Sequence, residues 1–368
     1  MTQITIDQYY DVKQQLIADT FNVLKELDPS AIEQRVTVTS GVLDNTWNWY
    51  QTVPESECFD RHFIEINLPL VARIVPKLFA WNCMGVQLMK SETDWIETLR
   101  VTFRLSEDKT IEMSPYEINT LFKTSKEAKV FNGVKGNPLG TTIEKLNVTA
   151  EKNIIAHIER PYNLSEWDSK PDNQNELLDS LTYEILAGME HYYYLDKIKS
   201  ISNAPIITYK HNHLDENTPS DSIDQMIIDT CNRVAPMTRR GAGNWAIINP
   251  TLYHILQKQN SFVHTDKKID TMVSIEYQGV LNGNIKIFVN QYASSDTPVL
   301  VGYKGSMQSD AGFFLGLYLP ITMNKFGDFF TQTAIKSLPT SKNALGLGTD
   351  YFYQIGVDVV MLKSYWYQ

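Results

Sequence analysis

The sequence is poor in cysteine and has no long hydrophobic run. Its 368 residues include only three cysteines, Cys58, Cys83 and Cys231, which are scattered and form no CxxC pair. This spacing argues against a disulfide framework or a zinc knuckle and fits a reducing compartment. No apolar run approaches the roughly 20 residues of a membrane span, and the N-terminus lacks the charged-then-apolar order of a signal peptide.

Positive charge is also scarce. Lysine and arginine number 33 against 43 acidic residues, which gives a formal net charge of -10. This balance argues against broad electrostatic attachment to nucleic acid as the main function. Hydrophobic residues make up 43% and charged residues 21% of the chain, as expected of a globular protein with a substantial core.

The first sixty residues divide into two stretches. Residues 7–27 are expected to form a helix, because Tyr9, Val12 and Leu16 recur at helical spacing on one face. That face needs a partner, which is either the protein's own domain or a neighbouring subunit. Residues 31–60 are expected to form an extended arm or a loosely packed connector, because "RVTVTSG" alternates like a strand.

The rest of the chain predicts an α+β protein with a central mixed sheet flanked by helices. The longest expected helix covers residues 174–199, where Leu178, Leu181, Ile185 and Met189 recur at helical spacing. Residues 221–234 and a proline-first segment from 250 predict further helices. "NWAII" predicts a buried strand, and Asn282-Gly283 is a strong signal for a hairpin turn. More strands are expected at 298–303, 311–319 and near 351–365.

One stretch, "VGYKGSMQSDAGFF" from residue 301, has the look of a ligand loop. A phosphate-binding loop needs GxxxxGK[ST] opening a helix, so that backbone N–H groups face the phosphate. Here Lys304 leaves a strand, and another strand-like run follows Gly312. A tight turn, in which Gly302 and Gly305 supply the backbone freedom, is the favoured interpretation.

Two other groups of polar residues are candidates for a metal site or an anion-binding site. His211 and His213 alternate as zinc ligands do on a strand, but a solvated loop is favoured because no third ligand is evident. Arg239 and Arg240, beside Gly241 and Gly243, form either an anion-binding loop or a salt-bridged mobile loop that faces another subunit. No Ser-His-Asp or Cys-His grouping is suggested locally. The sequence therefore predicts no catalytic, cofactor-binding or metal-binding residues, and no enzyme.

Three blocks, in order, resemble the major capsid proteins of T-even-type tailed bacteriophages. The first is "ARIVPKLFAWNCMGVQLM", 72–89, with Leu88 where the family prefers proline. The second is "RRGAGNWAII", and the third runs from 282 to 321 with Asn290 in place of the usual aspartate. The matching positions that we expect to be structural are Arg73, Pro76, Gly85, Gln87, Tyr292, Gly302, Tyr303, Lys304, Gly305, Asp310 and Gly312.

The resemblance implies an HK97-like capsid fold with four parts. These are an N-terminal arm (1–70), a peripheral domain (71–204) with an E-loop (about 95–160) and a spine helix (174–199), an axial domain (205–335), and a return to the peripheral domain (336–368). The arm would contact a neighbour through Tyr9, Val12 and Leu16, and the loop at Arg239 and Arg240 would lie near the capsomer axis. The excursion at 105–145 is shorter than the inserted domain of T-even proteins, which argues against docking of decoration proteins there.

The implied function is that of a major capsid protein, which self-assembles into an icosahedral virion shell around DNA without sequence-specific binding. Its partners would be further copies of itself in hexamers and pentamers, with vertex, portal, scaffold and decoration proteins. Assembly would take place in the host bacterial cytoplasm, with no membrane involved. A pentameric vertex protein of the same family and an encapsulin-like nanocompartment shell protein are the alternatives.

Overall fold

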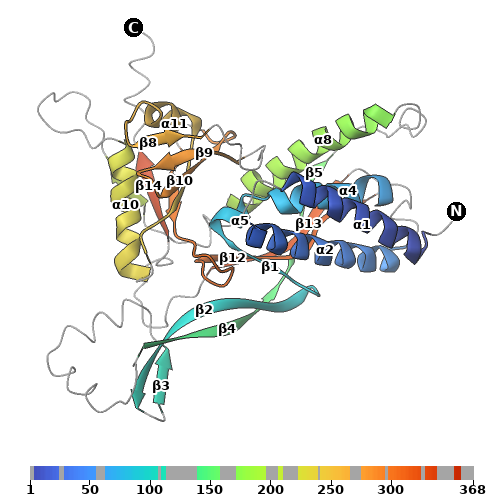
Figure 1. Ribbon diagram of the computed structural model, residues 1–368, viewed down its shortest axis with the longest axis horizontal. Helices are drawn as coiled ribbons and strands as arrows, with labels where there is room; N and C mark the ends of the chain where they lie inside the picture. The colour runs from blue at the N-terminus through green and yellow to red at the C-terminus, as the bar shows by residue number, and fades with distance from the viewer. Residues whose placement is uncertain are drawn as a thin grey trace, which may run out of the picture.

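Figure 1 shows two bodies side by side and a long hairpin that projects from them. This computed structural model describes residues 4–24, 29–54, 63–106, 109–112, 139–157, 171–195, 206–209, 223–238, 241–265, 275–294, 297–324, 328–337 and 352–357. The described residues form three sheets with helices around two of them, which confirms the α+β class. The expectation of a single central sheet was wrong.

Two long helices begin the chain. Helix α1 (Ile6–Val23) starts at a capping box in which Thr5 and Gln8 exchange hydrogen bonds, one residue before the expected start at residue 7. Helix α2 (Pro29–Thr52) packs against α1. The arm or strand expected at 31–60 was therefore wrong over its described residues.

Helix α2 carries its buried face in residues that are not typical of a helix core. Arg35, Thr39, Val42, Thr46 and Tyr50 are buried at intervals of three and four residues. The hydroxyls of Thr39 and Thr46 donate to the carbonyls four residues earlier, at 2.7 and 2.8 Å. These bonds satisfy the hydroxyl groups inside the helix. β-Branched residues that alternate like a strand in the sequence therefore form a helix here.

A run of short helical segments crosses the interior below α2. It comprises η1 (Phe63–Asn67), α4 (Leu68–Ile74), η2 (Val75–Lys77) and α5 (Ala80–Cys83). Every residue from Leu68 to Ala72 except Pro69 is buried, and so are Phe79 and Ala80. This segment lies in the centre of the protein core, where α2 and α8 (Pro171–Ala187) pack against α4.

The smaller main sheet has the order β1-β12-β13-β5, from β1 (Gly85–Leu88), β12 (Phe313–Met323), β13 (Asp328–Ser337) and β5 (Glu151–His157). Helix α8 and its continuation η5 (Gly188–Leu195), a π-helix, lie beside β5. This confirms the long helix over its described part. Leu178, Leu181, Ile185 and Met189 are buried, as their spacing predicts.

The larger sheet is mixed, with the order β6-β14-β11-β7-β10-β9-β8. Its strands are β6 (Ile206–Tyr209), β14 (Phe352–Val357), β11 (Val299–Gly302), β7 (Trp245–Ile248), β10 (Ile285–Asn290), β9 (Ile275–Leu281) and β8 (Phe262–His264). Asn282 and Gly283 have φ of 50° and 75° in the β9–β10 turn, which confirms the hairpin. Helices α10 (Ile223–Thr238) and α11 (Pro250–Leu256) confirm two further expectations.

The division of the chain between the two sheets differs from the expected domain boundaries. Strands β12 and β13 were expected in the axial domain, yet they pair with β1 and β5 in the smaller sheet. Strand β14 was expected to return to the peripheral domain, yet it pairs with β11 in the larger sheet. These pairings join strands that are distant in the sequence, such as Gly85 with Phe314, and local patterns do not contain that information.

One hydrophobic core is shared by both bodies. It contains Val42 from α2, Leu78 and Phe313 from the smaller body, and Trp245 and Phe288 from one face of the larger sheet. A second cluster fills the opposite face of the larger sheet beneath α10 and α11. Across the described ranges, no helix has the length and apolar character required to cross a bilayer.

Candidate assembly surface and the joint between the sheets

The projecting hairpin is formed by β2 (Thr93–Ser106) and β4 (Leu139–Thr149), with β3 (Lys109–Glu112) on the far side of β2 (Figure 1). Strand β2 pairs with β4 along its length, so alternate residues face opposite sides. Ile96, Thr98 and Val148 are buried on the inner side near the base. The hairpin therefore has one face that covers the body.

The other face, here called the outer hairpin face, is open to solvent. It consists of Trp95, Glu97 and Leu99 on β2 and their cross-strand partners Asn147, Lys145 and Ile143 on β4. Trp95 is 55% and Ile143 60% exposed, and the Glu97–Lys145 ion pair between them is 3.8 Å long. Large apolar side chains in a row on a projecting element are typical of a contact surface.

Specific hydrogen bonds fix the base of the hairpin. The Gln87 side chain donates to the Glu97 carbonyl and accepts from the Glu97 N–H, each at 2.8 Å. The Leu99 N–H donates to the Ser309 carbonyl at 2.9 Å. Gln87 was expected to be structural, and the structure places it where β1 meets the hairpin.

The three sequence blocks meet at Lys304. The Asn244 side chain accepts from the Lys304 N–H at 3.0 Å and donates to the Lys304 carbonyl at 2.7 Å. The Lys304 Nζ donates to the Trp81 carbonyl. Trp81 belongs to the first block, Asn244 to the second and Lys304 to the third. We call these three residues the Lys304 joint, because they tie the larger sheet to the helical body.

The turn that follows Lys304 is closed by its own backbone. Gly305 donates to the Asp310 carbonyl at 2.7 Å, and Lys304 and Ala311 form a β-bridge before β12 begins. A Cβ on Gly305 would lie 2.1 Å from Asp310 Oδ2, so any other residue here would force the Asp310 side chain to move. The segment is a strand-turn-strand, as expected, and Lys304 points into the protein.

The surroundings of Lys304 destabilise the positive charge of its side chain. Burial lowers the pKa of the Lys304 ammonium group to about 7, and Arg35 and Lys286 act in the same direction, whereas Cys83 opposes the shift. Among the described residues, Lys304 forms no ion pair.

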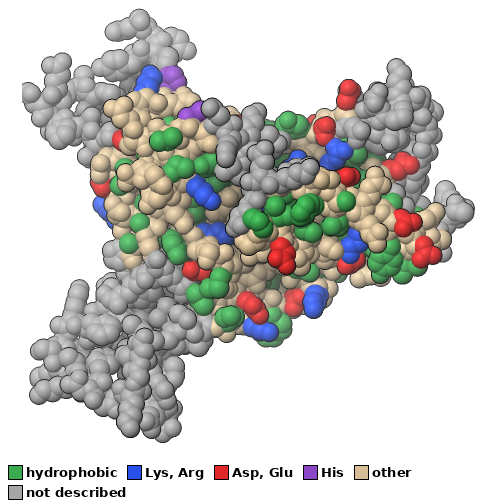
Figure 2. Space-filling view, viewed as in Figure 1, with side chains coloured by type: hydrophobic (Ala, Val, Ile, Leu, Met, Phe, Trp, Pro, Cys, Tyr) green, Lys and Arg blue, Asp and Glu red, His purple; other side chains and the backbone are tan. Residues whose placement is uncertain are grey.

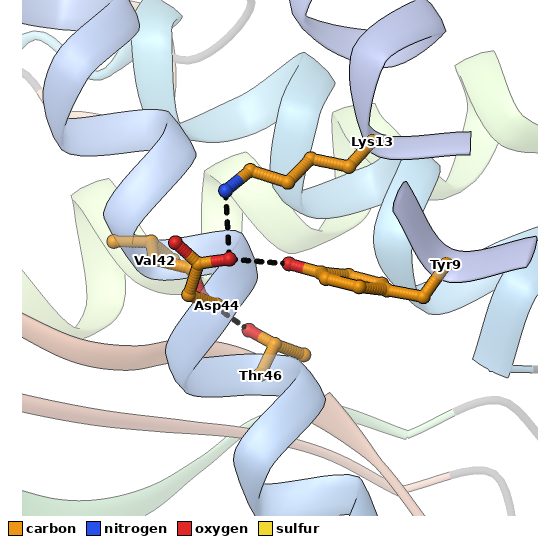
Figure 3. A network of polar contacts seen from close by, with 5 residues as sticks. All are labelled: Tyr9, Lys13, Val42, Asp44 and Thr46. Atoms are coloured by element: carbon orange, nitrogen blue, oxygen red, sulfur yellow. Dashed lines mark hydrogen bonds and ion pairs between the residues drawn. The ribbon is translucent and has the colours of Figure 1, made fainter. Parts of the chain in front are cut away.

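The N-terminal helices are held together by a polar network, shown in Figure 3. Asp44 on α2 accepts hydrogen bonds from the Tyr9 hydroxyl at 2.8 Å and from Lys13 Nζ at 2.7 Å. The Tyr9 ring stacks on Trp47 with centroids 4.6 Å apart. Burial raises the pKa of the Tyr9 phenol, and its hydrogen bond to Asp44 adds to the effect.

This network changes the expectation for the arm contacts. Tyr9 is 1% exposed, and Val12 and Leu16 pack against the core of the same chain. Their apolar face already has a partner, so these three residues do not form a free contact surface for a neighbouring subunit.

Other expected structural residues lie at contacts between elements. Arg73 pairs with Asp179 on α8 at 2.5 Å, and the Pro76 carbonyl accepts from Arg35 at 2.7 Å. A Cβ on Gly85 would lie 2.1 Å from the Gln308 carbonyl oxygen. Each joins two segments that are distant in the sequence.

The remaining expected residues are scattered over the larger sheet and the turn. Gly302 and Gly312 are buried, Tyr303 packs on the core, and Tyr292 is 45% exposed. Gly243 lies against Cys231, and Gly241 (φ 155°) lies against the Tyr303 ring. Arg239 and Arg240, like His211 and His213, lie outside the described residues.

Reactive chemistry is not favoured at the described cysteines. Burial raises the pKa of Cys231 to about 12 and raises that of Cys83 as well, which suppresses the nucleophilic thiolate form. Within the described segments, no group of three or more His, Cys, Asp or Glu residues has a geometry that could hold a metal ion.

Comparisons with known proteins match part of the chain. Residues 169–335 match the family model of the Major capsid protein Gp23. The major capsid protein of Vibrio phage KVP40 is 32% identical over 99 residues, which are 25% of this chain and 19% of that protein. The major capsid protein of Enterobacteria phage T4 is 31% identical over 96 residues, which are 24% of this chain and 18% of that protein. The aligned part thus spans about a fifth of the length of these relatives.

Solved structures were also compared. A chain of Microbacterium phage Oxtober96 has a TM-score of 0.41 at 13% identity, covering 77% of this chain and 91% of that chain. The encapsulin of Synechococcus elongatus PCC 7942 has a TM-score of 0.37 at 10% identity, with coverages of 76% and 87%.

The resemblance expected from the sequence is confirmed over residues 169–335. This segment includes α8, η5, all strands of the larger sheet except β14, and β12 with most of β13 in the smaller sheet. The α+β class is confirmed by the described sheets and helices.

Proposed function

We propose that this chain is the major capsid protein of a tailed bacteriophage, which assembles into the icosahedral head shell that encloses the DNA genome. One observation carries the proposal: the Gp23 major capsid match covers the long helix and the strands on both sides of the Lys304 joint. The match therefore includes parts of both bodies and not a single local motif.

The architecture supports an assignment of parts. We assign the seven-stranded sheet with α10 and α11 to the axial domain, and the four-stranded sheet with α8 and η5 to the peripheral domain. The β2–β4 hairpin is the E-loop. Helices α1 and α2 are part of the peripheral body, because Tyr9, Val42 and Leu43 lie in its core.

Self-association is best supported by the outer hairpin face. Stable obligate interfaces bury about 2,000–5,000 Å² and are largely apolar. The hairpin projects away from both bodies, so its exposed Trp95 and Ile143 are within reach of another copy in a shell (Figure 1). The intervening Glu97 and Lys145 pair with each other, so a contact on this face would bury no uncompensated charge from these two residues.

Charge supports the enclosure of DNA without tight binding to it. The chain has a formal net charge of -10. On the side of the molecule drawn in Figure 2, the lysine and arginine side chains of the described residues are scattered and form no broad basic patch. Partners in this proposal are other copies in hexamers and pentamers, with vertex, portal, scaffold and decoration proteins. The protein would assemble in the bacterial cytoplasm and end in the virion.

Electron microscopy of the purified chain, alone and with scaffold protein, tests the proposal. We expect closed icosahedral particles of phage-head size, built from hexamers. Small cargo-filled particles would favour a nanocompartment, and pentamers alone would favour a vertex protein. A chain that stays monomeric under all these conditions would contradict shell formation.

A matched pair of variants tests the outer hairpin face. We expect Trp95→Ser/Ile143→Ser to fold normally but to need at least about tenfold more protein to assemble, since burying one large apolar side chain contributes about 1.5–3 kcal/mol. Val263→Ser is the control, because Val263 is 64% exposed on edge strand β8. Equal assembly of both variants would exclude this face from the interface.

A further inference from the structure

The Lys304 joint lies where the chain passes from one main sheet to the other. Strand β11 of the larger sheet ends at Gly302, and β12 of the smaller sheet begins at Phe313. Between them, Asn244 holds the Lys304 backbone on the larger-sheet side. The Lys304 side chain reaches the Trp81 carbonyl on the helical side. One residue thus connects both bodies through its backbone and its side chain.

The groups around the amine are mostly cationic or neutral. Arg35 reaches it from α2, Lys286 from β10 and Cys83 from α5. The nearest buried carboxylate on η5, Glu190, accepts the Phe79 N–H at 2.8 Å. Arg35 is itself held over the Trp81 ring, 5.6 Å from the centroid. Among the residues that the structure describes, two cationic side chains act on Lys304 and no carboxylate pairs with it.

The neutral and the protonated forms of the Lys304 side chain differ in the hydrogen-bond acceptors and the solvation that they require. A neutral amine donates one hydrogen bond to Trp81 and leaves no charge to be solvated. An ammonium group has three N–H donors and a full charge. The structure gives Lys304 one side-chain acceptor, the Trp81 carbonyl. Unpaired donors and an unpaired charge in the interior are costly.

We infer that the Lys304 joint is a proton-sensitive coupling between the two bodies: the neutral amine holds them together, and protonation of Lys304 weakens the connection. The inference concerns the single subunit and does not depend on shell assembly. For a shell subunit, it would make the rigidity of the angle between the two bodies dependent on pH.

The direction of the pH dependence follows from the proton count. In the unfolded chain Lys304 keeps its proton up to a pKa near 10.5, whereas burial lowers the pKa in the folded chain to about 7. Between these values the unfolded state binds more protons, so the free energy of unfolding rises with pH. Below about pH 7 both states are protonated, and the full cost of the buried charge is present.

Urea unfolding of the full chain between pH 6 and 9.5 tests this. Between pH 7 and 9.5, the unfolding equilibrium constant of the wild type should fall by up to about tenfold per pH unit relative to Lys304→Met. Lys336→Met, which removes an exposed lysine from β13, should follow the wild type. Parallel pH profiles for the wild type and Lys304→Met would overturn the inference.

Hydrogen exchange on the wild type gives a second measurement that needs no variant. After correction for intrinsic exchange rates, peptides covering 78–86 and 300–312 should be more protected at pH 8 than at pH 6. Peptides from α11, which lies away from the joint, should change less, because they report only the change in global stability. Equal protection at both pH values, in a wild type whose α11 peptides are also unchanged, would overturn the inference.

Discussion

The N-terminal helices and the β2–β4 hairpin each have buried and exposed apolar residues, but they differ in which of these residues join them to the rest of the chain. Tyr9 on α1 and Val42 on α2 are 1% and 0% exposed in the core of the chain, whereas Trp95 and Ile143 on the hairpin are 55% and 60% exposed. Tyr9, with Val12 and Leu16, was expected to contact a neighbouring subunit. Tyr9 and Val42 therefore tie the helices to the core of the subunit, whereas Trp95 and Ile143 leave apolar surface open on the hairpin.

The difference arises from how each region is attached. Helix α1 contacts α2 and α4 along its length, and its Thr20 hydroxyl donates to the Ala72 carbonyl at 3.3 Å. In the described part of the hairpin, the attachment lies near its base, through the hydrogen bonds of Gln87 and Ser309 and the burial of Ile96 and Val148. A two-stranded element that leaves the body can bury only one face against it.

The largest expected effect is that of Tyr9→Ala. This change removes a buried ring stacked on Trp47 and the hydrogen bond to Asp44. We expect it to lower the free energy of unfolding by about 3–5 kcal/mol, as for other large buried aromatic residues. Urea unfolding of the unassembled subunit measures this directly.

Tyr10→Ala is the matched control, because Tyr10 is the next residue on the same helix and is 50% exposed. Its cost should be below about 1 kcal/mol. Similar costs for the two variants would mean that α1 is not part of the folded core, and that the helices and the hairpin are alike after all.

The sequence predicted elements whose signals are local. The stripe on α8, the Asn282-Gly283 turn and Pro250 at the start of α11 each follow from residues within a few positions. Helix α2 was missed although its buried residues have helical spacing. Arg35, Thr39 and Asn45 belong to that buried face, and a search for hydrophobic periodicity does not count them. Helix α2 becomes visible in the sequence when buried polar residues are counted together with apolar ones at intervals of three and four positions.

The Lys304 joint could not be predicted as a contact. Lys304 lies 223 residues from Trp81 and 60 from Asn244. The family resemblance located the three blocks but contains no information on which atoms meet. The same limit applies to β12, whose pairing with β1 placed the domain boundary differently from the one expected.

A smaller effect is expected from Asp44→Ala. The change leaves the buried Tyr9 hydroxyl and Lys13 without their acceptor, and an unmet buried donor costs about 1–3 kcal/mol. Asn48→Ala, at an exposed position on the same helix, should stay within about 0.5 kcal/mol. Unfolding midpoints of the two variants measure the difference. If both were equally stable, the network in Figure 3 would not be what joins α1 to α2.

The smallest effect is expected at the Glu97–Lys145 pair on the outer hairpin face. Its side chains are 50% and 65% exposed and 3.8 Å apart, so water and salt screen their attraction. A double-mutant cycle with Glu97→Gln and Lys145→Met should give a coupling energy of about 0–0.5 kcal/mol in the unassembled subunit. High salt should abolish this coupling energy.

If a neighbouring subunit covers this face in the shell, the Glu97–Lys145 pair is no longer exposed to water. The same substitutions should then weaken assembly more than they weaken folding. Equal small effects on both would mean that the pair stays exposed in the particle, and that the contact lies elsewhere on the hairpin.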